Sequence, residues 1–409
     1  MKRYSLLLTC LMTLSGSAAL AQTAPPSATT QPTGTFAVQQ WAVFVLDATQ
    51  GEINPNGLVG STLPEFVVTR RTSLSGDASN LPQPVGIIRL FGKSDSKVDI
   101  TIGKPLGGDF LSTWPPGEAR SNQMLWRDLT LSDQGPAGVE TGSETRWFFR
   151  LRRGNSASLA TPNGAGEQFL LFDITMPYVS ALKVKTGKDL SVQMRNTSKA
   201  TLHDLALYYE KDSQTWLQAP PADLPPESGA TAAPPVSAAV SAPQPPTTQP
   251  GPATIQLAAA PGASPKTLAD AWKPRLLQKG LAEADCDMMV SDIAVNAFDG
   301  PRLTAVYLMD DAELERLMPM EVVPEPRKII RVALVIIKNV DPTLGSDIDD
   351  LIAQLGDPVW ANREAAFRSL ERIGRAAESK LTQAESNPDA EIAWRAERLL
   401  GELAATNGQ

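Results

Sequence analysis

Short apolar runs separated by turn-forming residues dominate the chain between residues 35 and 218. Turn signals such as Asn-Pro-Asn-Gly at residues 54–57 and Asn-Gly at residues 163–164 fall between these runs. Many short strands at this spacing predict an antiparallel, β-sandwich-like N-terminal region over residues 35–218. The predicted strands span residues 36–46, 66–69, 85–91, 98–102, 147–151, 169–174, 182–184, 190–194 and 202–209.

The pattern then changes to a segment with little apolar content. Residues 219–266 are dominated by Pro, Ala, Ser, Thr and Gln, and residues 22–34 have the same character. Such segments bury too little apolar surface to offset the entropy of ordering the chain. We expect residues 219–266 to form a disordered, Pro/Ala-rich linker and residues 22–34 to form a flexible N-terminal segment.

Residues 267–343 combine helical and strand patterns and predict a small α/β unit. Residues 281–297 carry apolar side chains at helical spacing, including Cys286, which we expect in a core position. A strand over residues 302–309, a short helix over 310–318 and a long strand over 328–340 follow. The last strand is apolar on both faces, so it needs cover on both sides.

Residues 344–405 are predicted to be all helical. Ser346 and Asp349 suggest a capping box at the start of the first helix, and Gly374 ends a later helix. Two turns repeat the same spacing: Asp357 is followed six residues later by Arg363, and Asp389 by Arg395, with an offset of 32 residues between the pairs. This offset is typical of helical-hairpin repeats.

The residues around these turns resemble the HEAT repeat, especially the bacterial and phycobilisome-lyase-type forms. The matching residues are Leu355-Gly-Asp-Pro358, Arg363-Glu-Ala-Ala366, Leu370, Gly374, Ala376-Ala377, Leu381 and residues 389–396. The resemblance covers about the last 60 residues and about one and a half repeats. It implies HEAT-like hairpins, a binding or scaffolding role, and a ladder formed by Asp357, Arg363, Asp389 and Arg395. A plain helical hairpin that only packs is the alternative.

The first 21 residues predict export. Lys2 and Arg3 precede an apolar stretch, and Ala19-Leu20-Ala21 forms a cleavage site, so residues 1–21 read as a signal peptide. The apolar stretch is shorter than the roughly 20 residues of a spanning helix, so we expect no stable transmembrane anchor. These features predict a periplasmic, extracellular or cell-envelope location.

The net charge and the cysteine content disfavour one class of partner and exclude an internal disulfide. Removing Lys2 and Arg3 takes the formal net charge from −8 to −10, which disfavours nucleic acid as a partner. Only Cys286 remains in the mature chain, so an internal disulfide cannot form.

Catalytic motifs are missing from the sequence. One histidine, His203, lies beside Asp204 in a predicted strand, where neighbouring side chains point to opposite faces. One histidine and one cysteine cannot form the usual zinc sites, and we expect no cofactor and no enzymatic activity. The acidic clusters at residues 310–315 and 347–350 fall at helix starts, where acids favour the helix dipole. A hydrolase with an unrecognised carboxylate pair is kept as an alternative.

The tryptophans of the β region raise one more alternative. Trp114 precedes Pro115-Pro116-Gly117 and is the best candidate for a surface aromatic that stacks on a sugar ring. Arg146, Arg150 and Arg152 alternate along the predicted strand 147–151, where they suit either an acidic partner or a charged sheet edge. The sequence therefore predicts a non-catalytic exported protein that binds a protein partner or acts as a scaffold, with glycan binding as the alternative.

Overall fold

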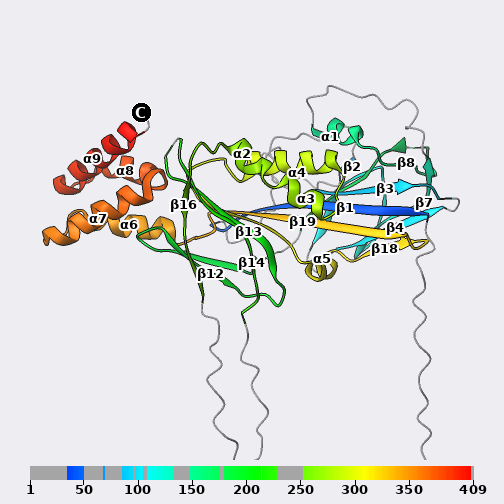
Figure 1. Cartoon of the computed structure of the whole chain (residues 1–409), viewed down its shortest axis with the longest axis horizontal. Coiled ribbons are helices and arrows are strands. Elements are labelled where there is room, and N and C mark those ends of the chain that lie inside the picture. The colour runs from blue at the N-terminus through cyan, green and yellow to red at the C-terminus, as the bar shows by residue number, and fades with distance from the viewer. Residues whose placement is uncertain are drawn as a thin grey trace, which may run out of the picture.

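A computed structural model describes residues 35–49, 68–69, 85–94, 97–104, 108–132, 147–164, 166–175, 179–212, 214–227 and 252–406. These residues form a β-rich body with several sheets, and helices lie at the C-terminal end (Figure 1). The predicted signal peptide, the segment 22–34 and the centre of the expected linker lie outside the described residues.

A ten-stranded sheet forms the centre of the body. In spatial order its strands are β16 (Ala258–Ala260), β14 (Trp216–Leu224), β13 (Leu202–Glu210), β17 (Leu303–Leu308), β19 (Lys328–Lys338), β1 (Phe36–Asp47), β3 (Val85–Gly92), β10 (Leu170–Thr175), β5 (Asp109–Trp114) and β2 (Val68–Thr69).

The long apolar strands β1 and β19 lie side by side at the middle of this sheet. They pair in parallel from Ala37 opposite Lys328 to Asp47 opposite Lys338, whereas the other pairs of this sheet are antiparallel. The expectation of a separate α/β unit at residues 267–343 is therefore corrected. Its strands β17 and β19 lie within the large sheet, between strands of the N-terminal region. This sheet is covered on both faces, as a strand that is apolar on both faces requires.

Helices cover one face of the large sheet (Figure 1). They are α1 (Trp147–Arg150), α2 (Pro265–Asp270), α3 (Lys273–Gln278) and α4 (Glu283–Asn296). Cys286, Met289 and Ile293 of α4 are buried against Trp41 and Val43 of β1 in one apolar cluster. The predicted helix and the core position of Cys286 are confirmed.

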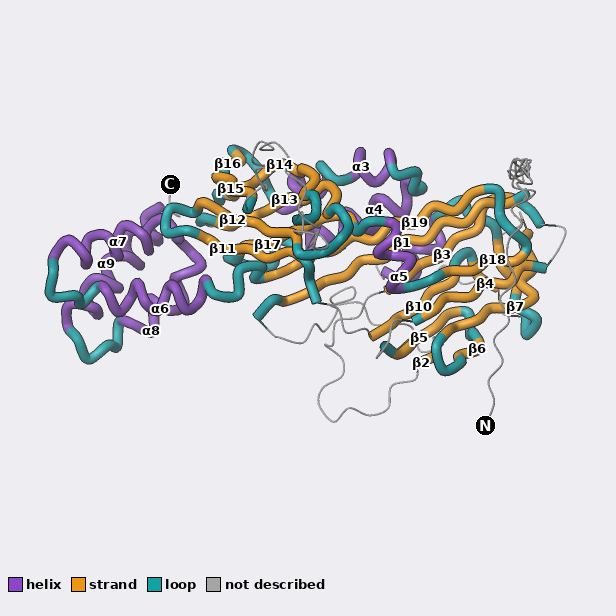
Figure 2. Tube along the Cα trace, turned by 90° about the horizontal axis from the view of Figure 1, so that it is seen from below, coloured by secondary structure: helices purple, strands orange, loops and turns teal. Residues whose placement is uncertain are grey.

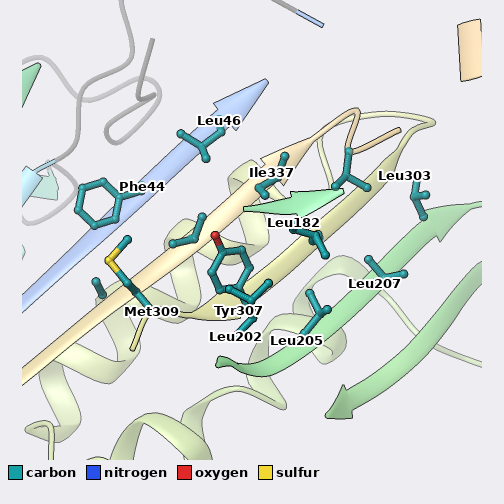
Figure 3. Packing of buried hydrophobic residues seen from close by; sticks show 14 of the residues in the cluster. Phe44, Leu46, Leu182, Leu202, Leu205, Leu207, Leu303, Tyr307, Met309 and Ile337 are labelled. Carbon is teal, nitrogen blue, oxygen red and sulfur yellow. The ribbon is translucent and has the colours of Figure 1, made fainter. Parts of the chain in front are cut away.

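Smaller sheets cover the opposite face. One contains β18 (Met320–Val323), β4 (Val98–Gly103), β7 (Gln123–Ser132), β8 (Ser158–Ala160), β9 (Gly166–Glu167) and β6 (Glu118–Ala119); the other contains β11 (Leu182–Thr186), β12 (Ser191–Asn196) and β15 (Ala253–Gln256). Figure 3 shows Phe44 of β1, Tyr307 of β17 and Ile337 of β19 in the apolar layer on this side of the sheet. The large sheet of the β region is therefore covered by helices on one face and by smaller sheets on the other.

Two local predictions are wrong. Residues 147–151 form α1 and a 3₁₀ turn, Leu151–Arg153, and not a strand, so the predicted row of arginines along a strand face does not exist. The first helix of the C-terminal region begins at Leu344 after Thr343, which leaves Ser346 inside the helix, where its hydroxyl donates to the carbonyl of Thr343.

The predicted bounds of the linker, residues 219–266, are wrong at both ends. Residues 219–224 continue β14, and β15 and β16 occupy residues 253–260. The described residues resume at 252 after 227, and β14 and β16 pair directly. Low apolar content hid this part of the sheets because only Ala219, Leu257 and Ala260 are buried within residues 219–224 and 252–260.

Candidate interaction surface on the C-terminal helices

The C-terminal region contains two helical hairpins. The helices are α6 (Leu344–Gln354), α7 (Trp360–Ile373), α8 (Glu378–Ala384) and α9 (Ala390–Thr406), with a 3₁₀ turn, Gly374–Ala377, before α8. Helix α6 packs on α7 and α8 on α9, while α7 also contacts α9 and α6 contacts α8. The two hairpins are therefore stacked, and they extend beyond the sheets at one end of the molecule (Figure 2).

The two aspartates of the repeated turns cap their hairpins in the same way. Oδ1 of Asp357 accepts a hydrogen bond from the backbone N–H of Val359 at 2.7 Å, and Oδ1 of Asp389 accepts from Glu391 at 2.9 Å. Each carboxylate thus binds the backbone two residues later, as is common in turns that lead into a helix.

The two arginines of the repeat converge on an acid that sequence reasoning missed. Nε of Arg395 lies 2.7 Å from Oε1 of Glu391, and Nε of Arg363 lies 3.3 Å from the same oxygen. Arg363 also donates to the carbonyl of Asp357 at 2.7 Å. The two hairpins are therefore joined by Arg363, Glu391 and Arg395, and the aspartates act through their turns. The spacing of Glu391 four residues before Arg395 was the signal in the sequence.

The tip of the β13–β14 hairpin holds the C-terminal end of α7. The ammonium of Lys211 donates to the carbonyls of Glu371 and Arg372, and the hydroxyl of Tyr209 donates to the carbonyl of Ile373. The last carbonyls of a helix have no partner within the helix and carry partial negative charge. A lysine and a tyrosine from the sheet therefore satisfy this helix end.

A glycine permits this close approach. Gly374 has a φ of +67°, and a Cβ atom there would lie 2.5 Å from the carbonyl oxygen of Lys211. Next to it, Arg375 forms an ion pair with Glu210, and its N–H donates to the carbonyl of Lys211 at 3.2 Å. The helices are thus fixed on the β body by groups on both sides of Gly374.

A second contact holds the start of α6. The ammonium of Lys185 in β11 lies 2.5 Å from Asp347, and the carboxylate of Asp341 accepts from the N–H of Thr186 at 2.7 Å. The apolar residues of α6 to α9 also belong to the same continuous core cluster as those of the sheets. The C-terminal helices therefore present their outer surface in a fixed orientation.

That outer surface carries exposed aromatic side chains. Trp360 is 63% exposed and Trp394 is 52% exposed, and no other tryptophan with a described side chain is exposed. Trp360 is the first residue of α7 and Trp394 lies in the second turn of α9, so both residues are near the N-terminal ends of these helices, which the Arg363–Glu391 contact joins. With Val359, which is also exposed, we name these residues the tryptophan patch.

Trp114, the aromatic predicted for a sugar site, lies in a different environment. Its side chain is half-buried, and its indole N–H donates to Oε2 of Glu167 at 3.0 Å. Glu167 is fully buried and also pairs with Arg152 at 2.7 Å. The expected surface position of Trp114 is not observed, because the polar edge of its ring is directed at a buried ion pair.

The remaining predicted groups occupy structural positions. His203 contacts Asp223 and Asp310, while its neighbour Asp204 binds Arg275 at 3.2 Å. Asp310 caps the helix α5 (Asp311–Leu317) by accepting from the N–H of Ala312, as the acidic helix start predicted.

Burial raises the pKa of the Cys286 thiol to about 11. Among the described residues, no group of three or more His, Cys, Asp or Glu side chains could hold a metal ion.

Comparisons with known proteins give little information on function. No model of a known protein family matches the chain, and no curated protein matches it. One matching solved structure is the yeast delta-COP-I mu-homology domain complexed with a Dsl1 WxWxV peptide. It has a TM-score of 0.26 and 8% sequence identity, over 75% of this chain and 96% of that chain. In the described part of the chain, every helix is too short or too polar to cross a membrane.

Proposed function

We propose that this chain is a non-catalytic exported protein of the cell envelope that binds a protein partner through its C-terminal helices. The observation that carries the proposal is the tryptophan patch. Large aromatic side chains that remain exposed on a rigid support are typical of the residues that contribute most to binding energy at protein interfaces. The two stacked hairpins agree with the HEAT-like repeat that the sequence resembles, and repeats of this kind serve as binding surfaces.

The attachment of the helices supports this proposal. A partner that binds a surface in a preset orientation loses less entropy than one that must order it. Lys211, Tyr209 and Arg375 hold the helices from one side and Lys185 from the other. The patch can therefore act as a preorganised site.

The test uses point variants, because truncation of the helices would expose the core residues that they cover. We expect the double variant Trp360→Ala/Trp394→Ala to fold normally and to lose at least about ten-fold in partner recovery, as is usual for interface anchors. Recovery is measured by crosslinking the mature chain in its native envelope, followed by pull-down and mass spectrometry. The matched control is Val295→Ala, because Val295 is 51% exposed on α4, away from the patch. Equal recovery of the same partners by the double variant and the wild type would refute the proposal.

Export is tested separately. We expect the chain isolated from the envelope fraction to begin at Gln22, because cleavage after Ala21 follows the small-residue signal. Amino-terminal sequencing of that fraction decides the point, and a chain that keeps Met1 would contradict it.

A further inference from the structure

The sole histidine of the chain lies between two carboxylates from different elements. Nδ1 of His203 in β13 is 3.3 Å from Oδ2 of Asp223 in β14, and Nε2 is 3.5 Å from Oδ2 of Asp310. Asp310 is the residue that caps α5. The ring is 30% exposed, so protons reach it from solvent.

The other charged groups nearby are engaged with each other. The N–H of Asp204 donates to Oδ1 of Asp223 at 3.0 Å, and the carboxylate of Asp204 binds Arg275. The N–H of Asp204, then His203, and more weakly Lys279, lower the pKa of Asp223. These contacts favour the ionised form of Asp223, and the nearby cations lie on the side of Asp204 and Asp223.

The protonation state of the ring decides whether both contacts are hydrogen bonds. An ionised carboxylate only accepts hydrogen bonds, a neutral imidazole has one N–H donor, and the imidazolium has two. A neutral His203 therefore faces one of its two acids with a lone pair. Protonation supplies the missing donor and a positive charge between two negative ones.

We propose that His203 is a pH-dependent clamp that, when protonated, ties β13 and β14 to the N-terminus of α5. Helix α5 buries Leu314 and Leu317 on the large sheet and leads directly into β18 of the smaller sheet. The clamp therefore joins the two sheet layers through one short helix. This inference is independent of the tryptophan patch.

The experiment measures how strongly the amides of α5 are protected from hydrogen exchange at pH 8 and pH 5.5, corrected for intrinsic exchange rates. Histidine changes charge within this range. We expect protection in the wild type to rise by about two- to five-fold on acidification, the size of a partly exposed ion pair, and to rise much less in His203→Gln. Because the chain has one histidine, its NMR titration is unambiguous and measures the fraction of protonated ring at each pH.

A matched pair of α5 variants separates the clamp from helix capping. Asp310→Asn removes the charge but keeps a good capping residue, so it should lose most of the pH response while α5 stays folded. Asp311→Asn removes the neighbouring charge and should keep the response. The proposal is overturned if His203→Gln retains the wild-type response, or if His203 titrates while the protection of α5 does not change.

Discussion

A buried ion pair joins α4 to the large sheet. Nε of Arg89 in β3 lies 2.8 Å from Asp285 in α4, and both side chains are almost completely buried. Gln39 of β1 donates to the same carboxylate, and Arg89 also donates to the carbonyl of Leu151 at 2.7 Å. Both charges are thus surrounded by polar partners, as ions removed from water must be.

Arg89→Met should reduce the free energy of unfolding by about 3–5 kcal/mol, because it leaves the carboxylate of Asp285 buried without its cation. The double variant Arg89→Met/Asp285→Leu should cost less than this single variant, since no buried charge remains. Chemical denaturation of the three proteins measures the differences. A double variant that is less stable than the single one would show that packing, and not charge, dominates at this position.

Asp292 is a second buried acid of α4 with a different environment. Burial raises its pKa well above the usual range, although Arg150 opposes this shift. Within the described part of the chain, its Oδ2 has no hydrogen-bond partner, and neither has the amide oxygen of Asn296 one turn later. The folded state therefore holds Asp292 in its neutral form over a pH range in which the unfolded chain ionises it.

Stability should consequently fall as pH rises. The folded state binds the Asp292 proton more tightly than the unfolded state, so the stabilisation is complete below the pKa of an unfolded aspartate, about 4. It is lost as pH rises toward the folded pKa, with a slope of about 1.4 kcal/mol per pH unit. Asp292→Asn should lack this slope in urea denaturation between pH 4 and 8. Glu397→Gln, at an exposed acid of α9, should retain it.

At the scale of elements, the joint between α7 and the β13–β14 hairpin depends on one lysine. Lys211→Met keeps the aliphatic stem but removes the charged donor to the carbonyls of Glu371 and Arg372. We expect a cost of about 1–3 kcal/mol, as for other hydrogen bonds to charged groups, with faster hydrogen exchange concentrated in α6 to α9. Lys380→Met breaks a surface pair with Asp349 and should cost less than about 1 kcal/mol. Equal effects of the two variants would contradict a capping role for Lys211.

The C-terminal helices α6, α7 and α9 were predicted well because apolar side chains recur at helical spacing along one face of each. The strand at β19 was predicted from a continuous apolar run, which is typical of a strand that is buried on both faces. The segment Trp147–Arg150 carries aromatic residues that favour strands. The chain forms a helix and a turn there instead, and Arg152 forms an ion pair with Glu167. The contacts of Glu391 with Arg363 and of Lys211 with the end of α7 could not be predicted, since the packing of separate segments brings these partners together.

At the scale of the whole molecule, the order of the strands in the large sheet differs from their order along the chain, so the sequence did not reveal the domain organisation. β17 and β19 follow the Pro/Ala-rich segment in sequence, yet they lie between β13 and β1, which precede it. A change of composition usually marks a domain boundary, and the sequence contains no signal for a strand that inserts between earlier ones. The described strands on the two sides of that segment therefore form one interleaved β body.

This interleaving predicts the outcome of cutting the chain. We expect a protease site engineered within residues 228–251 to give two fragments that remain associated and co-elute in native size-exclusion chromatography. Each fragment contributes strands to the centre of the large sheet, with β1 and β19 paired over eleven residue positions, from Ala37–Lys328 to Asp47–Lys338. Dissociation would expose the apolar faces of both strands, so separation should require denaturant. If the fragments elute separately without denaturant, the two regions are independent domains. As a control, cleavage engineered at the turn between α8 and α9 should release α9 more readily, because the main packing partners of α9 are the helices α6, α7 and α8.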